Sequence, residues 1–308
     1  MSIDYDVVVI GSGPAGLTAG IYCGRARLNT VIMERSNPGG AIVNAYLVEN
    51  FPAFPQGISG ADLVANMMSQ AMNYGVKFEF REVISVDLMG NFKIVNTTDG
   101  SFMAKTVIIA SGARPRRLGV AGEEELIGRG ISFCAMCDGE QFASEDVAII
   151  GGGEGGVSEG LYMTRIASKV TIIEVTPTLN APAILQERVK GNTKVDVLLS
   201  TQVKEITEAE GKKCLRIKNI KSGEESHLKV SGIFILIGVE PNAEYLCSLV
   251  ELDKDGFVRV RNNMETSIPG IFAAGDIRSG SARQAIAAAG DGAVAALSAQ
   301  QYVSTSQS

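Results

Sequence analysis

The chain has 308 residues, of which 45% are hydrophobic, and this length and apolar content are typical of a globular protein with two domains. Its 28 Lys and Arg against 34 Asp and Glu give a net charge of −6 and a pI near 5.1, which argues against nucleic acid as a partner. The apolar stretches are shorter than the roughly 20 residues that cross a bilayer, and the acidic N-terminus resembles no secretory signal, so we expect no membrane contact and a cytoplasmic location.

A nucleotide-binding unit is predicted at the N-terminus. Residues 7–10 are apolar and mostly β-branched, the sequence GSGPAG follows at 11–16, and residues 17–25 have the apolar periodicity of a helix. In a strand, turn and helix of this kind, the glycines let the backbone approach a pyrophosphate at the helix N-terminus. The next apolar strand, residues 30–33, ends in Glu34, whose carboxylate can accept hydrogen bonds from a ribose diol. The sequence therefore predicts a dinucleotide site.

Two crossovers between domains are predicted where buried strands are followed by a proline. Residues 107–110 precede Pro115, and residues 233–239 precede Pro241. Proline interrupts regular structure, which suits a chain that passes from one domain to another. A basic cluster at the first crossover is either a solvated hinge or a docking point for an acidic partner, and it consists of Arg114, Arg116 and Arg117.

The redox-competent pair of the sequence is Cys134 and Cys137, which Asp138 follows. A two-residue spacer lets the sulfurs close a small disulfide ring, and the adjacent carboxyl can supply or accept a proton. Half of a zinc site and two buried thiols are the alternatives. No second such pair is present and the single histidine, His227, lies in a polar run, so we expect no metal and no histidine catalysis. The other cysteines are expected to be packing residues: Cys23, Cys214 and Cys247.

The strand, glycine turn, helix and strand then occur a second time. Residues 147–150 precede GGGEGG at 151–156, a helix is expected through about residue 166, and the strand 170–173 ends in Glu174. The first glycine and the terminal acid are 23 residues apart in both units. A glycine-rich helix entry that binds nothing is the alternative. The predicted NAD-like contacts of this unit are Gly151, Gly153, Gly156 and Glu174.

The C-terminal segment is expected to complete the first domain. It contains the apolar run 271–277 and a small-residue helix over about 283–297, without a third nucleotide unit. Residues 83–95 and 203–230 indicate antiparallel meanders. The predicted fold is therefore α/β, with two Rossmann-like dinucleotide-binding domains and β-meander excursions, the second domain inserted in the first. The predicted segments are 1–115, the inserted 116–242, and 243–308.

Seven motifs along the chain resemble those of one family. The order GSGPAG, VENFP, ASGARP, CAMCDG, GGGEGG, AAGD and RQA is similar to that of the low-molecular-weight, bacterial-type thioredoxin reductases and of the flavin part of the alkyl hydroperoxide reductase flavoprotein. The resemblance implies an FAD domain built from both ends of the chain, an inserted pyridine-nucleotide domain that carries the redox disulfide, a homodimer, and a hinge between the domains.

The resemblance also implies roles for single residues. Cys137 would face the flavin, Cys134 would attack the disulfide of a protein partner, and Asp138 would be the general acid. The residues implied or predicted to contact FAD are Gly11, Ser12, Gly13, Pro14, Ala15, Gly16, Glu34, Arg35, Gly40, Asn50, Ala110, Ser111, Gly112, Gly275, Asp276, Arg283, Gln284 and Ala285.

The sequence departs from the family pattern at three places. NADPH-dependent members carry a His-Arg-Arg cluster after the second unit's second strand, where this chain has Glu174-Val-Thr, and a carboxylate there repels a 2′-phosphate. We therefore expect the donor to be NADH or a non-nicotinamide donor such as ferredoxin, with NADPH disfavoured. Ala41 and Ala53 stand where relatives often have Gln and Gly.

The leading hypothesis is an FAD-dependent disulfide oxidoreductase that passes electrons through Cys134 and Cys137 to a separate thioredoxin-like protein. One alternative is a non-catalytic flavoprotein redox sensor, whose disulfide state changes partner binding. The other is a flavin-only NAD(P)H or ferredoxin reductase, for which both cysteines are dispensable.

Overall fold

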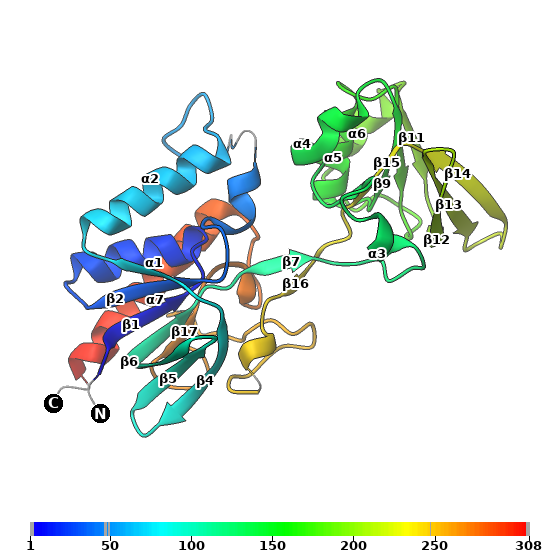
Figure 1. Cartoon of the computed structure of the whole chain (residues 1–308). Coiled ribbons are helices and arrows are strands. Elements are labelled where there is room, and N and C mark those ends of the chain that lie inside the picture. The colour runs from blue at the N-terminus through cyan, green and yellow to red at the C-terminus, as the bar shows by residue number, and fades with distance from the viewer. Residues whose placement is uncertain (1–2, 46–47, 49, 247, 306–308) are drawn as a thin grey trace. The chain divides into compact units, whose positions relative to one another are not determined.

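The computed structural model describes residues 3–45, 48, 50–246 and 248–305 (Figure 1). The chain divides into two compact units, of which the first comprises Met1–Arg114 with Glu240–Ser308 and the second comprises Pro115–Val239. These bounds differ from the sequence-predicted segments by one residue at the first crossover and by three at the second.

The first unit places helices on one face of a mostly parallel sheet and a β-meander with C-terminal segments on the other. Its elements are β1 (Tyr5–Ile10), α1 (Pro14–Arg25), β2 (Thr30–Glu34), η1 (Gly40–Asn44), α2 (Gly60–Asn73), β3 (Lys77–Phe80), β4 (Val83–Met89), β5 (Phe92–Thr97), β6 (Gly100–Ile109), η3 (Glu244–Leu246), β17 (Ile271–Ala273), η4 (Gly275–Ile277) and α7 (Ala285–Thr305). In the described part of the chain the sheet order is β3-β2-β1-β6-β5-β4, and β17 also pairs with β6.

The central strand β1 explains why this sheet needs cover on both faces. It runs parallel to β2 and β6, in the register Val8↔Val31 and Val8↔Val107. Val7 and Val9 pack among residues of α1, α2 and α7, whereas Val8 and Ile10 pack with β4, β5 and the C-terminal segments. A continuous apolar run is the expected pattern for a parallel strand buried on both faces.

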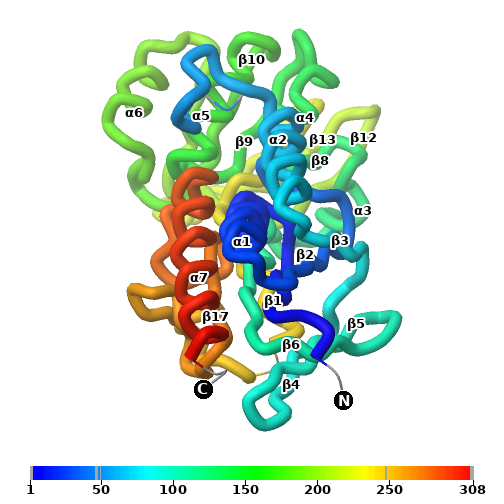
Figure 2. The backbone as a smooth tube through the Cα atoms, turned by 90° about the vertical axis from the view of Figure 1, so that its left-hand side faces the viewer, coloured from blue at the N-terminus to red at the C-terminus, as the bar shows by residue number. Residues whose placement is uncertain are grey.

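The C-terminal helix α7 lies beside α1 (Figure 2). A Cβ atom on Gly292 of α7 would lie 2.1 Å from the carbonyl oxygen of Ala15 on α1, so glycine permits this close approach. The strand β17 runs parallel to β6, with Ile271 opposite Val107. The C-terminal segment therefore completes the first unit, as the sequence predicted.

The second unit repeats this plan. Its elements are α3 (Glu123–Leu126), β8 (Ile131–Ser132), α4 (Ala135–Asp138), η2 (Gly139–Phe142), β9 (Asp146–Ile150), α5 (Glu154–Met163), β10 (Lys169–Ile173), α6 (Ala183–Lys190), β11 (Val195–Leu198), β12 (Thr201–Ala209), β13 (Lys212–Asn219), β14 (Glu225–Val230) and β15 (Gly232–Ile235). A parallel sheet has the order β11-β10-β9-β15-β8, and β12, β13 and β14 form a separate antiparallel meander. The predicted α/β fold class, with two Rossmann-like sheets and a meander, is confirmed.

The predicted crossovers form short strands that pair with each other. These strands are β7 (Ala113–Pro115) and β16 (Val239–Pro241), and each ends at the predicted proline. The Arg114 guanidinium contacts the carboxylates of Glu240, at 2.7 Å, and Glu244. Arg114 is therefore paired with acidic residues of its own chain.

The ends of two helices differ from the prediction. The helix α5 ends at Met163, before residue 166, while α7 begins at Ala285 and continues to Thr305, beyond residue 297. The last turns of α7 pack on the rest of the unit, because Val303 is buried and Tyr302 receives a hydrogen bond of 3.2 Å from the Lys93 Nζ. Within the described ranges, no helix is both long and apolar enough for a bilayer.

Candidate functional site

The glycine loop of the first unit has the backbone that a pyrophosphate cradle requires. Gly11 has φ +101°, and a Cβ there would lie 2.4 Å from the Ala110 carbonyl oxygen, so this position requires glycine. A Cβ on Gly16 would lie 1.9 Å from the Gly11 oxygen, which permits the tight entry into α1. A Cβ on Gly13 would meet only the Gly39 oxygen, at 3.8 Å, so the backbone is open there. Pro14, Ala15 and Gly16 form the first turn of α1. The loop therefore fits a dinucleotide phosphate.

The glycine loop of the second unit has the same geometry at the three matched positions. Gly151 has φ +121° with its Cβ position 2.1 Å from the Leu236 oxygen, and a Cβ on Gly156 would lie 2.0 Å from the Gly151 oxygen. Gly153 has open space around its Cβ position and precedes the first residue of α5. The second loop therefore fits a pyrophosphate by the same test as the first.

The two acidic residues at the strand ends are held alike. Glu34 accepts hydrogen bonds from the amide and hydroxyl of Ser12, at 3.0 and 2.7 Å, and from the amide of Ser36 at 3.1 Å. Glu174 accepts hydrogen bonds from the Gly152 amide at 2.5 Å, and from the amide and hydroxyl of Thr176 at 2.8 and 2.9 Å. Each carboxylate receives three protein donors, and its four lone-pair sites leave one for a ribose hydroxyl.

Further residues predicted to contact FAD lie together in the first unit. The Asn50 amide donates a hydrogen bond of 2.9 Å to the Gln284 side chain, which joins two motifs that are 234 residues apart. A Cβ on Gly40 would lie 3.4 Å from the Gly13 Cα, and a Cβ on Gly275 would lie 2.9 Å from the Ala15 Cβ. The geometry thus brings the VENFP and RQA motifs together and sets the AAGD loop against the first glycine loop.

Asp276 is a half-buried carboxyl in this group. Burial raises its pKa, and a hydrogen bond of 2.9 Å from the Ser281 hydroxyl opposes that rise. Its loop is fixed by a residue that the sequence analysis missed, since the Asp291 carboxylate pairs with the Arg278 guanidinium at 2.6 Å and accepts the Gly275 amide at 3.1 Å. The sequence signal for this pair is weak because the two residues are 13 positions apart across a loop.

The remaining predicted FAD residues lie at the edges of this group. Ser111 donates a hydrogen bond of 2.9 Å to the Asn242 carbonyl oxygen, and the Asn242 amide donates one of 3.1 Å to the Gly112 carbonyl oxygen. The Arg283 guanidinium lies 5.5 Å from the centre of the Phe257 ring. Arg35 is exposed next to Glu34, and Ala285 is the first residue of α7.

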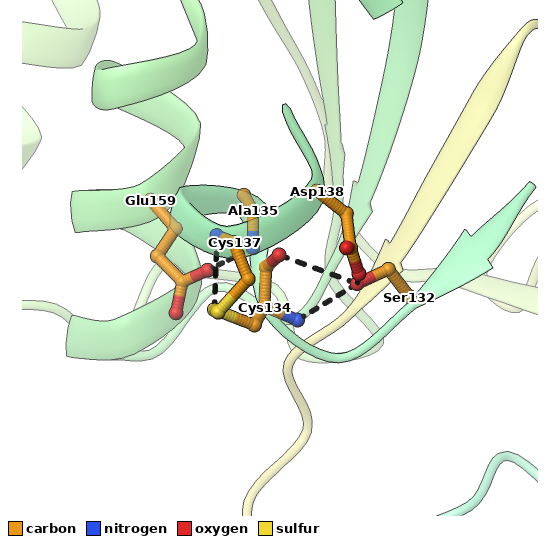
Figure 3. The surroundings of a disulfide bond; sticks show 6 residues. All are labelled: Ser132, Cys134, Ala135, Cys137, Asp138 and Glu159. Carbon is orange, nitrogen blue, oxygen red and sulfur yellow. Dashed lines mark hydrogen bonds between the residues drawn. A yellow bond between two sulfur atoms is a disulfide. The ribbon is translucent and has the colours of Figure 1, made fainter. Parts of the chain in front are cut away.

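The redox pair lies at the end of β8, on a single helical turn (Figure 3). Cys134 and Cys137 form a disulfide with Cα atoms 5.3 Å apart. Cys134 is the N-cap of α4, and the Cys137 amide donates a hydrogen bond of 3.1 Å to the Cys134 sulfur. Cys137 is exposed and Cys134 is half-buried. Within the described ranges, no group of His, Cys, Asp and Glu residues is arranged to hold a metal ion.

Asp138 is held beside this pair by Ser132, which the sequence analysis did not single out. The Ser132 hydroxyl donates a hydrogen bond of 2.6 Å to the Asp138 carboxylate and accepts one of 3.1 Å from the Cys134 amide. Ser132 therefore links the predicted general acid to the backbone of the predicted attacking cysteine. The sequence feature that could have identified Ser132 is its position two residues before the first cysteine.

The other predicted packing cysteines have ordinary environments. Cys23 is buried in the first unit, and this burial raises the pKa of its thiol to about 12. Cys214 is half-buried on β13, and Cys247 lies outside the described residues.

In the basic cluster, the Arg117 guanidinium lies 4.5 Å from the centre of the Phe133 ring, next to Cys134, and Arg116 is exposed.

Comparisons with known proteins agree with this geometry. The family described as pyridine nucleotide-disulphide oxidoreductase matches residues 5–292. The chain is 44% identical over 301 residues to a thioredoxin reductase of Listeria innocua, covering 97% of this chain and 94% of that protein. The thioredoxin reductase structure of Lactococcus lactis, described as the FR conformation, has a TM-score of 0.92 and 39% identity, over 98% of this chain and 100% of that one.

A second solved structure extends the comparison. The thioredoxin reductase of T. acidophilum has a TM-score of 0.89 and 35% identity, and the match covers both chains completely, at 100% each. The family match, the identity over nearly the whole chain and the disulfide on the second nucleotide-type unit lead to one assignment. The chain belongs to the low-molecular-weight thioredoxin reductase family, as a flavoprotein oxidoreductase with a redox-active disulfide.

Proposed function

We propose that the chain passes electrons from FAD through the Cys134–Cys137 disulfide to a thioredoxin-like protein, with NADH or a non-nicotinamide donor such as ferredoxin as the source. The observation that carries this proposal is the disulfide on its own helical turn, beside a carboxyl held by Ser132. The family implies FAD and a pyridine nucleotide as cofactors. NADPH is the nicotinamide that we propose to be disfavoured.

The residues of the chain divide the proposed chemistry between them. FAD, when bound, supplies two electrons. Reduction of the disulfide breaks the bond between Cys134 and Cys137, consumes two electrons and two protons, and gives two thiols. Asp138, oriented by Ser132, delivers or accepts the proton at the sulfurs.

Transfer to the partner then follows thiol–disulfide exchange. The Cys134 thiolate attacks one sulfur of the partner disulfide and releases the other as a thiolate, which takes up a proton. Cys137 next loses its proton and attacks Cys134 in the mixed disulfide, so the partner leaves as a dithiol and the Cys134–Cys137 bond forms again. The two electrons pass to the partner in this exchange.

The proposed donor preference is supported by charge at the end of β10. The Glu174 carboxylate is buried, bonded to the glycine loop, and followed by Val175 and Thr176 where NADPH-dependent relatives have arginines. A fixed negative charge repels the 2′-phosphate of NADPH and accepts a hydrogen bond from the free 2′-hydroxyl of NADH. In the first unit, Glu34 also accepts hydrogen bonds from two backbone amides and one hydroxyl, and there the hydroxyl is that of Ser12 in the glycine loop.

The sulfur chemistry is tested without a natural donor. Flavin-loaded protein, reduced with dithionite under anaerobic conditions, is mixed with oxidised thioredoxin, and the thioredoxin thiols are counted. We expect the wild type and the control Cys214→Ser to transfer electrons, whereas Cys134→Ser and Cys137→Ser lose at least a hundredfold in rate. Transfer at the wild-type rate by Cys134→Ser would contradict the proposal.

The two alternatives predict different turnover. A flavin-only reductase keeps turnover with small-molecule acceptors and is indifferent to both cysteine substitutions. A redox sensor transfers electrons once and shows no multiple turnover with any donor, yet its affinity for a partner changes with the disulfide state.

We also propose that the protein is a homodimer, which sedimentation of the flavin-loaded protein tests. We propose a cytoplasmic location, where thiols such as Cys23 and Cys214 stay reduced.

A further inference from the structure

A second carboxylate, Glu159 on α5, contacts the redox turn and has no role in the proposed function. The Ala135 amide donates a hydrogen bond of 2.5 Å to a Glu159 carboxylate oxygen, and the Met136 amide also interacts with this carboxylate. Ala135 and Met136 are the two residues between the cysteines. Figure 3 shows the turn between Glu159 on one side and Asp138 with Ser132 on the other.

The hydrogen bonds that the structure gives Glu159 come from backbone amides. Burial raises the pKa of Glu159, and the two backbone amides oppose that rise. Among the residues that the structure describes, Glu159 makes no ion pair. The other titratable side chains of the turn and its neighbour η2 are acidic as well, namely Asp138 and the exposed Glu140. The helix α6, which packs on α5, carries Glu187, Arg188 and Lys190.

We propose that Glu159 is a positioning residue of the redox centre, which fixes the turn through the Ala135 amide and raises the proton affinity of the thiols formed on reduction. The proposal rests on the redox activity of the pair. Reduction adds two electrons and two protons to the Cys134–Cys137 bond. A negative charge beside the resulting thiols disfavours their thiolate forms, and it occupies amide donors that would otherwise stabilise a thiolate. The carboxylate therefore favours the protonated form of the reduced pair over the thiolate.

Four substitutions separate the charge from the hydrogen bond. Glu159→Gln keeps an oxygen that can accept the Ala135 amide but removes the charge, and Glu159→Ala removes both. Glu159→Asp keeps the charge and shows whether the site tolerates substitution if the other variants do not fold. The control Glu140→Gln removes an exposed carboxylate three residues after Cys137, where solvent screens its charge.

The readout is the proton affinity of the thiols, which needs neither an electron donor nor thioredoxin. The full-length, flavin-loaded protein is reduced with dithiothreitol, freed of the reagent without air, and alkylated with iodoacetamide over a range of pH. Mass spectrometry follows Cys134 and Cys137 separately, and hydrogen exchange follows the Ala135 amide. Loss of thioredoxin reduction in the wild type would contradict the proposed function and leave this measurement unaffected.

In Glu159→Gln we expect the pH of half-maximal alkylation to fall by about one unit for at least one of the two cysteines. At a pH below the midpoints of both wild type and variant, this cysteine should then be alkylated about tenfold faster than in the wild type. Glu159→Ala removes the charge and also frees the amide donors, so it should show a fall at least as large as that of Glu159→Gln and, in addition, faster exchange of the Ala135 amide. Glu159→Asp and Glu140→Gln should keep the wild-type midpoints. Wild-type midpoints in Glu159→Gln, or an equal fall in Glu140→Gln, would overturn the proposal.

Discussion

At the residue scale, Ala53 has a backbone conformation that favours glycine. Its φ is +80°, in the left-handed region, and it lies in the loop after Asn50 that contains a predicted flavin contact. The resemblance to the family indicated this position, where we expected Gly, but not the reason. A left-handed conformation costs a residue with a Cβ about 1–2 kcal/mol.

We therefore expect Ala53→Gly to stabilise the protein. Relief of the left-handed strain exceeds the conformational entropy that glycine loses on folding, about 0.5–1 kcal/mol, so the net gain is about 0.5–1 kcal/mol. Thermal unfolding of the flavin-loaded protein should show a midpoint higher by about 1–3 °C. The control Ala41→Gly, on the exposed face of η1 with no positive φ, should lower the midpoint. A lower midpoint in Ala53→Gly would contradict this account.

The half-buried Asp276 predicts a pH dependence of stability in the flavin-free protein. Burial raises its pKa in the folded state, so between the ordinary value of about 4 and the folded value the unfolded chain binds fewer protons. Its contribution to stability therefore falls as pH rises above about 4. Asp276→Asn should be more stable than wild type at pH 7 and equal to it below about pH 3, whereas the exposed control Asp99→Asn should show no such difference. Denaturant titrations at both pH values test this.

Residues that contact the redox turn but are distant from it in sequence were not predictable from the spacing of motifs. Glu159 lies 24 positions after Ala135 in sequence, on the helix that follows the second glycine loop. The glycine pattern predicted that helix but not which of its faces packs on α4. Cys134, Cys137 and Asp138 were found because their chemistry is local in sequence.

At the element scale, both glycine loops were predictable because their conformation requires glycine. Gly11 and Gly151 have positive φ with no room for a Cβ, so the presence of glycine at these positions indicates the conformation of the loop. The C-terminal end of α7 was not predictable, since no sequence signal near Leu297 shows whether the helix ends there or continues. Tertiary contacts of Val303 and Tyr302 extend the helix instead.

The end of β10 should control which nicotinamide is accepted. We expect the triple variant Glu174→Gln, Val175→Arg and Thr176→Arg to bind NADPH at least tenfold more tightly than wild type, because two guanidinium groups then face the 2′-phosphate. Gln at 174 keeps an acceptor for the Gly152 amide. Isothermal titration calorimetry with NADPH measures the change, and a control with arginines at the exposed positions Ile184 and Glu187 should show none. Unchanged affinity in the triple variant would contradict the assignment of this turn.

At the scale of the whole molecule, the insertion of one unit into the other was predictable from the order of the motifs. The sequence has two similar nucleotide-type units and a C-terminal segment without a glycine loop of its own. Because that segment cannot form a third unit, we predicted that it completes the first. The pairing of β17 with β6 and the packing of Gly292 on Ala15 give the physical reason. Contacts such as that between Asn50 and Gln284 followed only from the fold.

We propose a flavin-linked disulfide reductase in which Glu174, at the end of β10, disfavours NADPH. The most direct test is an anaerobic titration of the flavin-loaded protein with NADH and, separately, NADPH, followed at the absorbance of oxidised flavin. We expect NADH to bleach the flavin and NADPH to do so at least tenfold more slowly, or neither to bleach it while dithionite does, in which case the donor is not a nicotinamide. Bleaching by NADPH as fast as by NADH, or faster, would contradict the account.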